Sequence, residues 1–95
     1  MKTILTESEK ELGKLIREYR ELAEFSQKQI ADRLGLSNPV FISQIENGGS
    51  RIPHFTLGEF MAILNIPPKK VFYLLRKIHD ERVLREVLRG RNSRG

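Results

Sequence analysis

Apolar residues recur every three or four positions along most of this 95-residue chain, which is the spacing of an amphipathic α-helix. The first stripe predicts a helix that begins near residue 7, because Thr6 with Glu9 and Ser8 with Glu11 have the spacing of capping boxes. Charged residues occupy the other face of this helix. The apolar stripe comprises Leu12, Leu15, Ile16, Tyr19, Leu22 and Ala23.

Residues 25–48 predict two shorter helices separated by a tight turn. Ser26 and Gln29 have capping-box spacing at the start of the first helix. Gly35 follows its last apolar position, where a helix end needs a residue that tolerates positive φ. The small side chain of Ala31 allows the second helix to cross close over the first. The apolar positions of the first helix are Ile30, Ala31 and Leu34.

The second helix of this pair is expected to begin at Asn38-Pro39. Asn38 can cap it, and Pro39 suits its first position, where no backbone N–H is needed. Ile42 and Ile45 lie three apart and are predicted to point inward, and Asn47-Gly48-Gly49 ends the helix. Two short helices crossing in this way form a helix-turn-helix, whose second helix enters the DNA major groove.

Two more helices are predicted after a loop at residues 49–54. Thr56 with Glu59 has capping-box spacing, and Asn65 is expected to end the fourth helix in the left-handed conformation. Pro67-Pro68 interrupts the chain, and Lys69 is expected to begin the fifth helix. The inward positions are Leu57, Phe60, Met61 and Leu64 in the fourth helix and Val71, Leu74, Leu75 and Ile78 in the fifth.

The C-terminal segment carries a second apolar stripe, which comprises Val83, Leu84, Val87 and Leu88. On one straight helix this stripe would lie nearly opposite the first one. Either the chain breaks near His79-Asp80 and folds back, or the stripe contacts another subunit. Self-association is the favoured interpretation, because two-fold dimers are the commonest oligomers. Residues 90–95 are expected to be a flexible end.

The sequence resembles the XRE family, the group of phage lambda-type repressors, Cro proteins and their bacterial relatives. The resemblance covers roughly residues 10–75, and Ile42-Ser43-Gln44-Ile45-Glu46-Asn47-Gly48 is its most specific part. It implies an all-α, five-helix, lambda-repressor-like domain that binds a double-stranded DNA operator. One departure is that residues 38–41 are one residue longer than the usual junction between turn and second helix. Further matches are Ser26-Gln27, Ile30-Ala31, Leu34-Gly35, Ser37, Pro53, Phe55, Leu57, Phe60 and Leu64.

The resemblance and the side-chain chemistry together nominate residues for DNA binding. Gln27 resembles the family glutamine that contacts a phosphate and steadies the base-reading side chains. Asn and Gln side chains suit the edge of adenine, whereas Val40 can only contact a thymine methyl group. Arg51 is the one full charge in the loop that in relatives follows the sugar-phosphate backbone. The complete set is Gln27, Asn38, Val40, Ser43, Gln44, Asn47, Ser50, Arg51 and His54.

Other charged residues receive different assignments. Glu46 is expected to be structural, with Arg33 as its suggested partner, because a carboxylate would repel DNA phosphates. Arg17 and Arg20 are candidates for phosphate contacts. The net charge of +5 lies mostly in residues 69–95, which hold nine Lys or Arg against three Asp or Glu. Residues 1–68 hold eight against nine, so the basic excess lies outside the helix-turn-helix. It suggests either a solvated basic helix or contact with a polyanion.

The composition limits the other possible classes of protein. The chain has no cysteine and only short apolar runs, so we expect a cytoplasmic protein without disulfides or membrane spans. The two histidines lie far apart, and no residue set has catalytic or metal-ligand spacing, so no enzyme, cofactor or metal is expected.

The resulting hypothesis divides the chain at residue 78. Residues 1–78 form the DNA-binding domain, and residues 79–95 form a helical extension that dimerises through Val83, Leu84, Val87 and Leu88. The protein would bind a two-fold symmetric operator as a homodimer and repress transcription. The main alternative is a module whose extension grips a partner protein, as an antitoxin grips its toxin. A third interpretation is a basic protein that binds nucleic acid without sequence preference.

Overall fold

The structure, a computed structural model, describes residues 4–94 and contains five α-helices and no strands within that range. The helices are α1 (Glu7–Leu22), α2 (Gln27–Arg33), α3 (Val40–Glu46), α4 (His54–Leu64) and α5 (Pro68–Ser93). The all-helical, five-helix architecture predicted from the sequence is thus confirmed.

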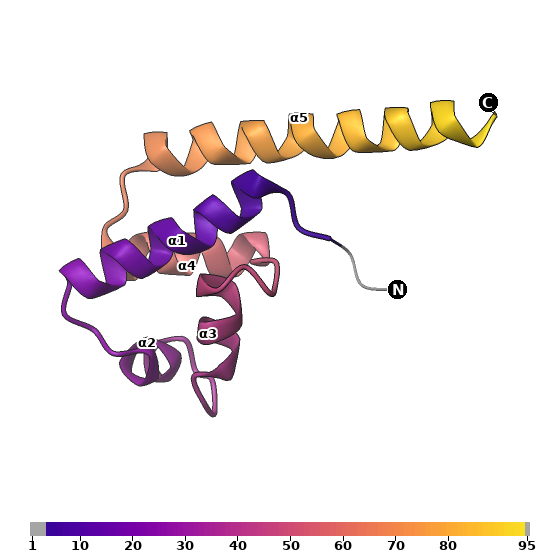
Figure 1. Ribbon diagram of the computed structural model, residues 1–95. Helices are drawn as coiled ribbons and strands as arrows, with labels where there is room; N and C mark the ends of the chain where they lie inside the picture. The colour runs from indigo at the N-terminus through magenta and orange to yellow at the C-terminus, as the bar shows by residue number, and fades with distance from the viewer. Residues whose placement is uncertain (1–3, 95) are drawn as a thin grey trace.

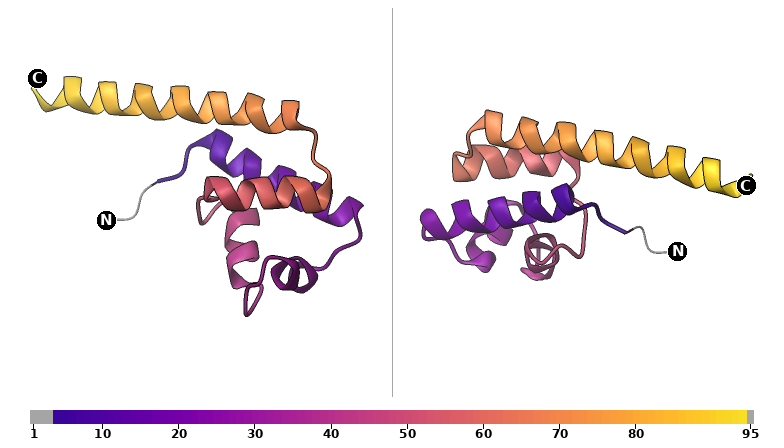
Figure 2. Two further views of the ribbon diagram at one scale, coloured as in Figure 1. Left: turned by 180° about the vertical axis from the view of Figure 1, so that it is seen from behind. Right: turned by 45° about the horizontal axis from the view of Figure 1, so that its top comes forward.

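Helix α1 is the centre of the arrangement (Figure 1). It contacts α3, α4 and α5, and α2 packs against α3. Helix α5 lies along one side of α1, whereas α2 and the turn that follows it lie on the opposite side (Figures 1 and 2). The core between them consists of Leu12, Ile16, Ile30, Ala31, Ile42, Ile45, Leu57, Phe60, Leu64, Ile66, Val71 and Leu74.

The N-terminus of α1 is held by local and long-range hydrogen bonds. The predicted capping box at Thr6 forms, since Thr6 Oγ1 accepts from the Glu9 N–H and Glu9 Oε1 accepts from the Thr6 N–H. The overlapping box at Ser8 does not form, because Ser8 lies inside the helix and is buried. Its hydroxyl and its backbone N–H instead donate to Glu81 on α5, at 2.7 and 3.3 Å. These bonds hold the pKa of the Glu81 carboxyl below its ordinary value.

Glycine makes the close contact between α1 and α3 possible. A Cβ atom on Gly13 would lie 2.1 Å from the Ile45 carbonyl oxygen, far inside van der Waals contact. The sequence signal for this contact is a glycine in the interior of a predicted helix, three residues before the core residue Ile16.

Three helix termini differ from the prediction, namely the end of α1 and the starts of α4 and α3. Helix α1 ends at Leu22, and the chain turns away through Glu24 at a φ of 61°. Leu22 is 76% exposed, and Ala23 lies past the helix end and is exposed as well, so neither residue belongs to the buried stripe. Helix α4 begins at His54 after Pro53, so Thr56 lies within the helix and does not cap it. Pro39 is the N-cap of α3 and not its first residue, although the Asn38 side chain does accept a hydrogen bond from the Val40 N–H at 3.0 Å.

The predicted turn residues adopt the expected conformations. Gly35 has a φ of +74°, and the N–H of Leu36 donates to the Ala31 carbonyl at 2.8 Å, which closes the end of α2. Helix α3 ends at Glu46, directly before the predicted stop, and Gly48 follows with a φ of +73°. Asn65 ends α4 in the left-handed conformation, as predicted.

Helix α5 is a single helix of 26 residues that begins at Pro68, one residue earlier than predicted. The suggested break near His79-Asp80 does not occur, because nothing in that segment interrupts the backbone ladder. Residues 90–93, predicted to be part of a flexible end, continue the helix to Ser93, and the single Gly90 costs only about 1 kcal/mol. The C-terminal part of the helix extends beyond the other four helices (Figure 1).

Replacement of Gly13 by alanine is expected to separate α1 from α3. The added methyl group must displace the backbone of Ile45, so the free energy of unfolding should fall by about 1–3 kcal/mol although alanine favours helices. Gly58→Ala is the matched control, because a Cβ there has open space in α4 and should be neutral or stabilising. Urea unfolding followed by circular dichroism measures both variants, and equal stability of the two would contradict the close α1–α3 packing.

Candidate nucleic-acid interface

Helices α2 and α3 each bury one face in the core and leave the other face exposed. Ile30 and Ala31 of α2 and Ile42 and Ile45 of α3 are all at most 1% exposed, so both helices are anchored in the core. With seven residues each, these helices would be marginal in isolation and depend on this packing. The arrangement matches the predicted helix-turn-helix.

A buried ion pair orients the C-terminal end of α3. Arg20 of α1 donates to Glu46 through Nε at 2.6 Å and through Nη2 at 3.0 Å, and the two side chains are 11% and 1% exposed. Arg20 Nη1 also donates to the Phe25 carbonyl at 2.7 Å, so the guanidinium fixes the turn between α1 and α2. The hydrogen bonds to Glu46 raise the pKa of Arg20 above its ordinary value.

The structure corrects two assignments made from the sequence. The partner of Glu46 is Arg20 and not Arg33, whose guanidinium lies over the Phe25 ring, 5.2 Å from its centroid. Arg20 is therefore committed to the interior and is not available to a phosphate. Its role was missed because Glu46 lies 26 residues away. The sequence held one signal for this role. Arg20 lies four residues after the core residue Ile16, at the border of the apolar stripe.

Gln27, predicted to contact a phosphate, occupies the first position of α2 and is half-buried. Its Nε2 donates to Glu46 Oε1 at 3.0 Å, which connects α2 to the same ion pair. The carboxylate of Glu46 thus receives donors from α1 and α2 while it belongs to α3. One buried group therefore sets the relative orientation of three helices.

The outward side of α3 carries the candidate base-reading residues. At helical spacing, Val40, Ser43, Gln44 and Asn47 share one face, opposite Ile42 and Ile45. Val40 is 57% exposed, Gln44 and Asn47 are exposed, and Ser43 is half-buried and accepts a hydrogen bond from Asn47 Nδ2 at 3.3 Å. Asn38 is exposed just before this face. The surface is uncharged, and it presents amide and hydroxyl groups beside one aliphatic side chain.

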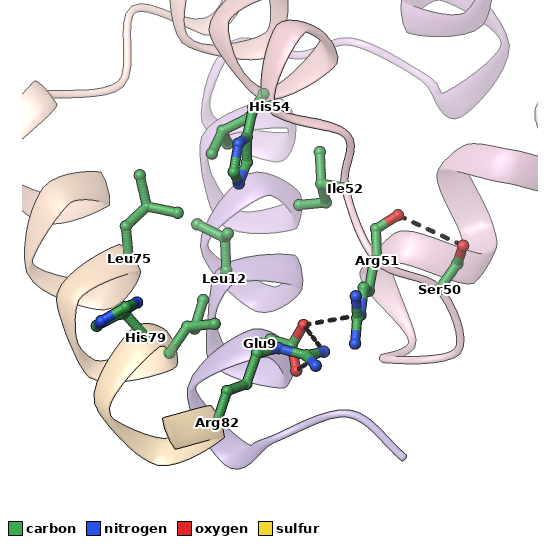
Figure 3. Close-up of a pocket in the computed structure, with 11 residues that line it drawn as sticks. Glu9, Leu12, Ser50, Arg51, Ile52, His54, Leu75, His79 and Arg82 are labelled. Atoms are coloured by element: carbon green, nitrogen blue, oxygen red, sulfur yellow. Dashed lines mark hydrogen bonds and ion pairs between the residues drawn. The ribbon is translucent and has the colours of Figure 1, made fainter. Parts of the chain in front are cut away.

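The loop residues lie in a different environment. Arg51 turns toward α1, where its Nε lies 3.5 Å from Glu9 Oε2 (Figure 3). Ser50 Oγ donates to the Arg51 carbonyl at 3.5 Å, and His54 is the exposed first residue of α4. The structure therefore brings Asn38, Val40, Ser43, Gln44 and Asn47 together, and it directs Arg51 and His54 toward a neighbouring cavity.

The basic excess of the chain lies away from the α2–α3 turn. Residues 69–95 carry this excess, and α5 lies on the side of α1 opposite α2 (Figures 1 and 2). Among residues 4–94, no group of three or more His, Asp or Glu is placed to hold a metal ion. Within the same residues, no helix is both long enough and apolar enough to cross a membrane.

Comparison with known proteins agrees with this geometry. A family model described as helix-turn-helix matches residues 16–71, which extend from the middle of α1 to the first turn of α5 and make up more than half of the chain. No curated protein matches the chain.

Removal of the Glu46 carboxylate is expected to leave Arg20 buried and unpaired. Glu46→Ala should lower the free energy of unfolding by about 3–5 kcal/mol, the usual cost of breaking a buried ion pair. Glu21→Ala is the control, because its pair with Arg17 is more than half exposed and contributes at most about 1 kcal/mol. In urea unfolding, the double variant Arg20→Met with Glu46→Leu should recover part of the loss. A Glu46→Ala variant as stable as Glu21→Ala would contradict the role of the pair.

Proposed function

Because this chain belongs to the XRE family of helix-turn-helix DNA-binding transcription regulators, we propose that it is a repressor that binds a two-fold symmetric operator as a homodimer. The activity of this family is DNA binding and not catalysis. Beyond membership of the family, the proposal states how the protein recognises a DNA sequence, that it acts as a dimer, and that it represses transcription. It also includes the cytoplasm as the site of action, since a repressor works where its DNA is.

The observation that carries the proposal is the exposed, uncharged polar face of α3 on a rigidly held helix. A side chain in the major groove can discriminate bases only if its own position is well defined. The position of α3 is fixed by the packing of Ile42 and Ile45 and by the ion pair at Glu46. Gln44 is exposed on this face and can bind the N6/N7 edge of adenine with two hydrogen bonds.

The surrounding residues divide into two proposed roles. Asn38 and Asn47 add amide groups at the two ends of α3, and Val40 offers an apolar contact to a thymine methyl group. Ser43 on the same face of α3 and Gln27 at the start of α2 are proposed as polar contacts that fix the position of α3 on the duplex. Ser50, Arg51 and His54 are proposed to contact the sugar-phosphate backbone, which positions the protein without reading the sequence.

Arg51 must change partner to contact a phosphate. Its present contact with Glu9 is long, at 3.5 Å, and the side chain is 50% exposed. Glu9 would not be left unpaired, because Arg82 already donates to both of its carboxylate oxygens, at 2.7 and 2.8 Å. The exchange of Glu9 for a phosphate is therefore compatible with the rest of the structure.

The proposed dimer forms through the outer face of α5. Val83, Leu84, Val87 and Leu88 are 43–60% exposed, although they are large and apolar. A projecting helical end of this length is marginal in water unless its apolar side is covered. A second copy would cover it, and a two-fold dimer would present two α3 helices to paired half-sites. Such a dimer at a promoter blocks access of the polymerase.

The same exposed stripe is the observation that favours the second candidate function. A different protein, such as a toxin bound by its antitoxin, could cover α5 in place of a second copy. The oligomeric state of the purified protein separates the two candidates. A dimer supports self-association, and a monomer that forms no dimer at high concentration supports the partner-binding module.

Selection of binding sites from random duplex DNA at near-physiological salt tests the function. We expect a two-fold symmetric motif with half-sites about one helical turn apart. Gln44→Ala should lose preference at one base pair of each half-site, at a cost of about 1–3 kcal/mol, because the bidentate contact is removed. Asn92→Ala, which removes an exposed amide near the end of α5, should select the unchanged motif. Recovery of no motif, or an unchanged preference in Gln44→Ala, would contradict the assignment of α3.

Substitution of the outer stripe tests the dimer. Leu84→Glu with Leu88→Glu places two carboxylates in the proposed interface, so we expect folded monomers that bind operator DNA weakly. Arg89→Gln with Ser93→Glu changes the net charge by the same amount on the opposite side of α5 and should remain dimeric. Analytical ultracentrifugation measures the mass of each variant. A dimer that survives the two leucine substitutions would show that the subunits associate elsewhere.

A further inference from the structure

A cavity of about 390 Å³ opens between α1, the loop after α3 and the first half of α5. It is separate from the outward face of α3, because none of the base-reading candidates on that helix lines it. Figure 3 shows its arrangement, with Leu12 at the centre and Ile52, Leu75, His54, His79, Arg51 and Arg82 around it. Its volume lies at the lower end of the range for ligand pockets, about 300–1,000 Å³.

The interior of this cavity is aliphatic. Leu12 of α1 and Leu57 of α4 are buried beneath it, at 5% and 3% exposure. Ile52, Leu75 and Ile78 form its walls and are only partly buried, so each retains apolar surface on the cavity side. An apolar ligand would remove this surface from water, which is favourable in proportion to the area covered.

The rim of the cavity carries an unbalanced positive charge. Arg51 and Arg82 both approach the single carboxylate of Glu9 (Figure 3). Burial opposes ionisation of Glu9, but hydrogen bonds from Thr6 and Arg82 outweigh it and hold the pKa of the carboxyl below its ordinary value. Two guanidinium groups therefore share one negative charge. Arg82 takes the short contacts, and Arg51 keeps a 3.5 Å ion pair with a half-exposed side chain.

Two imidazole groups complete the rim. His54 at the start of α4 and His79 on α5 are both exposed, and a ring N–H of either can donate a hydrogen bond in the neutral or the charged form. The rim thus offers the free N–H groups of Arg51 and two imidazole donors above an aliphatic interior. Donors of this kind are suited to a carboxylate, which Arg binds in a bidentate manner.

We propose that this cavity binds a small organic monocarboxylate, with its apolar body against Leu12, Ile52 and Leu75 and its carboxylate on Arg51 and the neighbouring imidazoles. A single negative charge matches the one guanidinium charge that Glu9 leaves uncompensated. An inorganic anion would not use the aliphatic interior, and a neutral molecule would leave Arg51 without an added partner.

A ligand in this cavity would influence the proposed DNA-binding surface through Arg51. Arg51 lines the cavity and also belongs to the loop proposed to contact the DNA backbone, so one side chain would serve either the ligand or a phosphate. This consequence rests on the proposed function, whereas binding of the ligand does not. The test below therefore uses the protein without DNA.

Three probes with the same eight-carbon tail test the proposal, namely octanoate, octan-1-ol and octylammonium. Each is titrated into the full chain labelled with ¹⁵N, and amide shifts are followed by NMR. We expect octanoate to saturate with shifts near Leu12, residues 50–57 and residues 75–82. Its affinity should exceed that of octylammonium by about tenfold or more, because a charge-assisted contact replaces a repulsive one.

Two variants locate the carboxylate. Arg51→Gln should weaken octanoate binding by about tenfold, because it removes the uncompensated charge but leaves the Glu9–Arg82 bonds intact. Arg76→Gln removes an exposed arginine on α5 outside the cavity and should bind octanoate as the unmodified chain does. Unchanged spectra outside the cavity show that both variants are folded.

The outcomes separate clearly. Absence of saturable shifts, equal affinity for octan-1-ol, or an Arg51→Gln variant with undiminished affinity would each overturn the proposal. Shifts confined to Val83, Leu84, Val87 and Leu88 would do so as well, because they would assign the binding to the outer stripe of α5. An operator found or not found by DNA selection has no bearing on these results.

Discussion

The buried pair of Arg20 and Glu46 is the interaction on which the DNA-binding geometry depends. Two charges removed from water must remain paired, because an unpaired one costs several kcal/mol. Glu46 is nearly inaccessible and accepts hydrogen bonds from α1 and α2 while belonging to α3. Any rotation of α3 would lengthen these bonds. The pair thus contributes more to the orientation of α3 than to net stability, since a hydrophobic replacement of similar volume often stabilises equally well.

A second set of polar contacts secures α5 to the start of α1. Ser8 donates to Glu81 with both its hydroxyl and its backbone N–H, and Arg82 donates to Glu9. These contacts fall where the first apolar stripe of α5 ends. Beyond them, α5 projects past the other helices of residues 4–94, and its apolar side chains Val83, Leu84, Val87 and Leu88 are exposed. One uninterrupted helix therefore serves as core element in its first half and as exposed surface in its second.

Glu9 connects helix α1, helix α5 and the loop after α3. Its carboxylate belongs to the capping box of α1, accepts hydrogen bonds from Arg82 of α5, and forms an ion pair with Arg51 of the loop after α3. The basic excess of the chain lies on α5 and not on the face of α3. The proposed recognition by α3 would therefore rely on amide and hydroxyl groups, and long-range attraction to DNA would come from another side of the molecule.

The sequence by itself determined the helices and the sides they bury. The spacing of Ile30 and Ala31 and of Ile42 and Ile45 predicted the buried faces of α2 and α3, and Asn65 was correctly predicted as a left-handed helix end. Such features depend on neighbours within one or two helical turns, so they are visible in local patterns. The uncharged face of α3 follows from the same periodicity.

Only the tertiary structure decided which polar groups meet. The partner of Glu46 lies 26 residues away, and Ser8 and Glu81 are 73 residues apart, so no local spacing connects them. Gly13 required the approach of α3 before its role was apparent. Leu22 is exposed because it is the last residue of α1, after which the chain turns away through Ala23 and Glu24. The continuity of α5 was likewise open in the sequence, since its two opposite stripes fit a break as well as a straight helix. Packing against α1 accounts for the first stripe alone, and for this reason the second remains exposed.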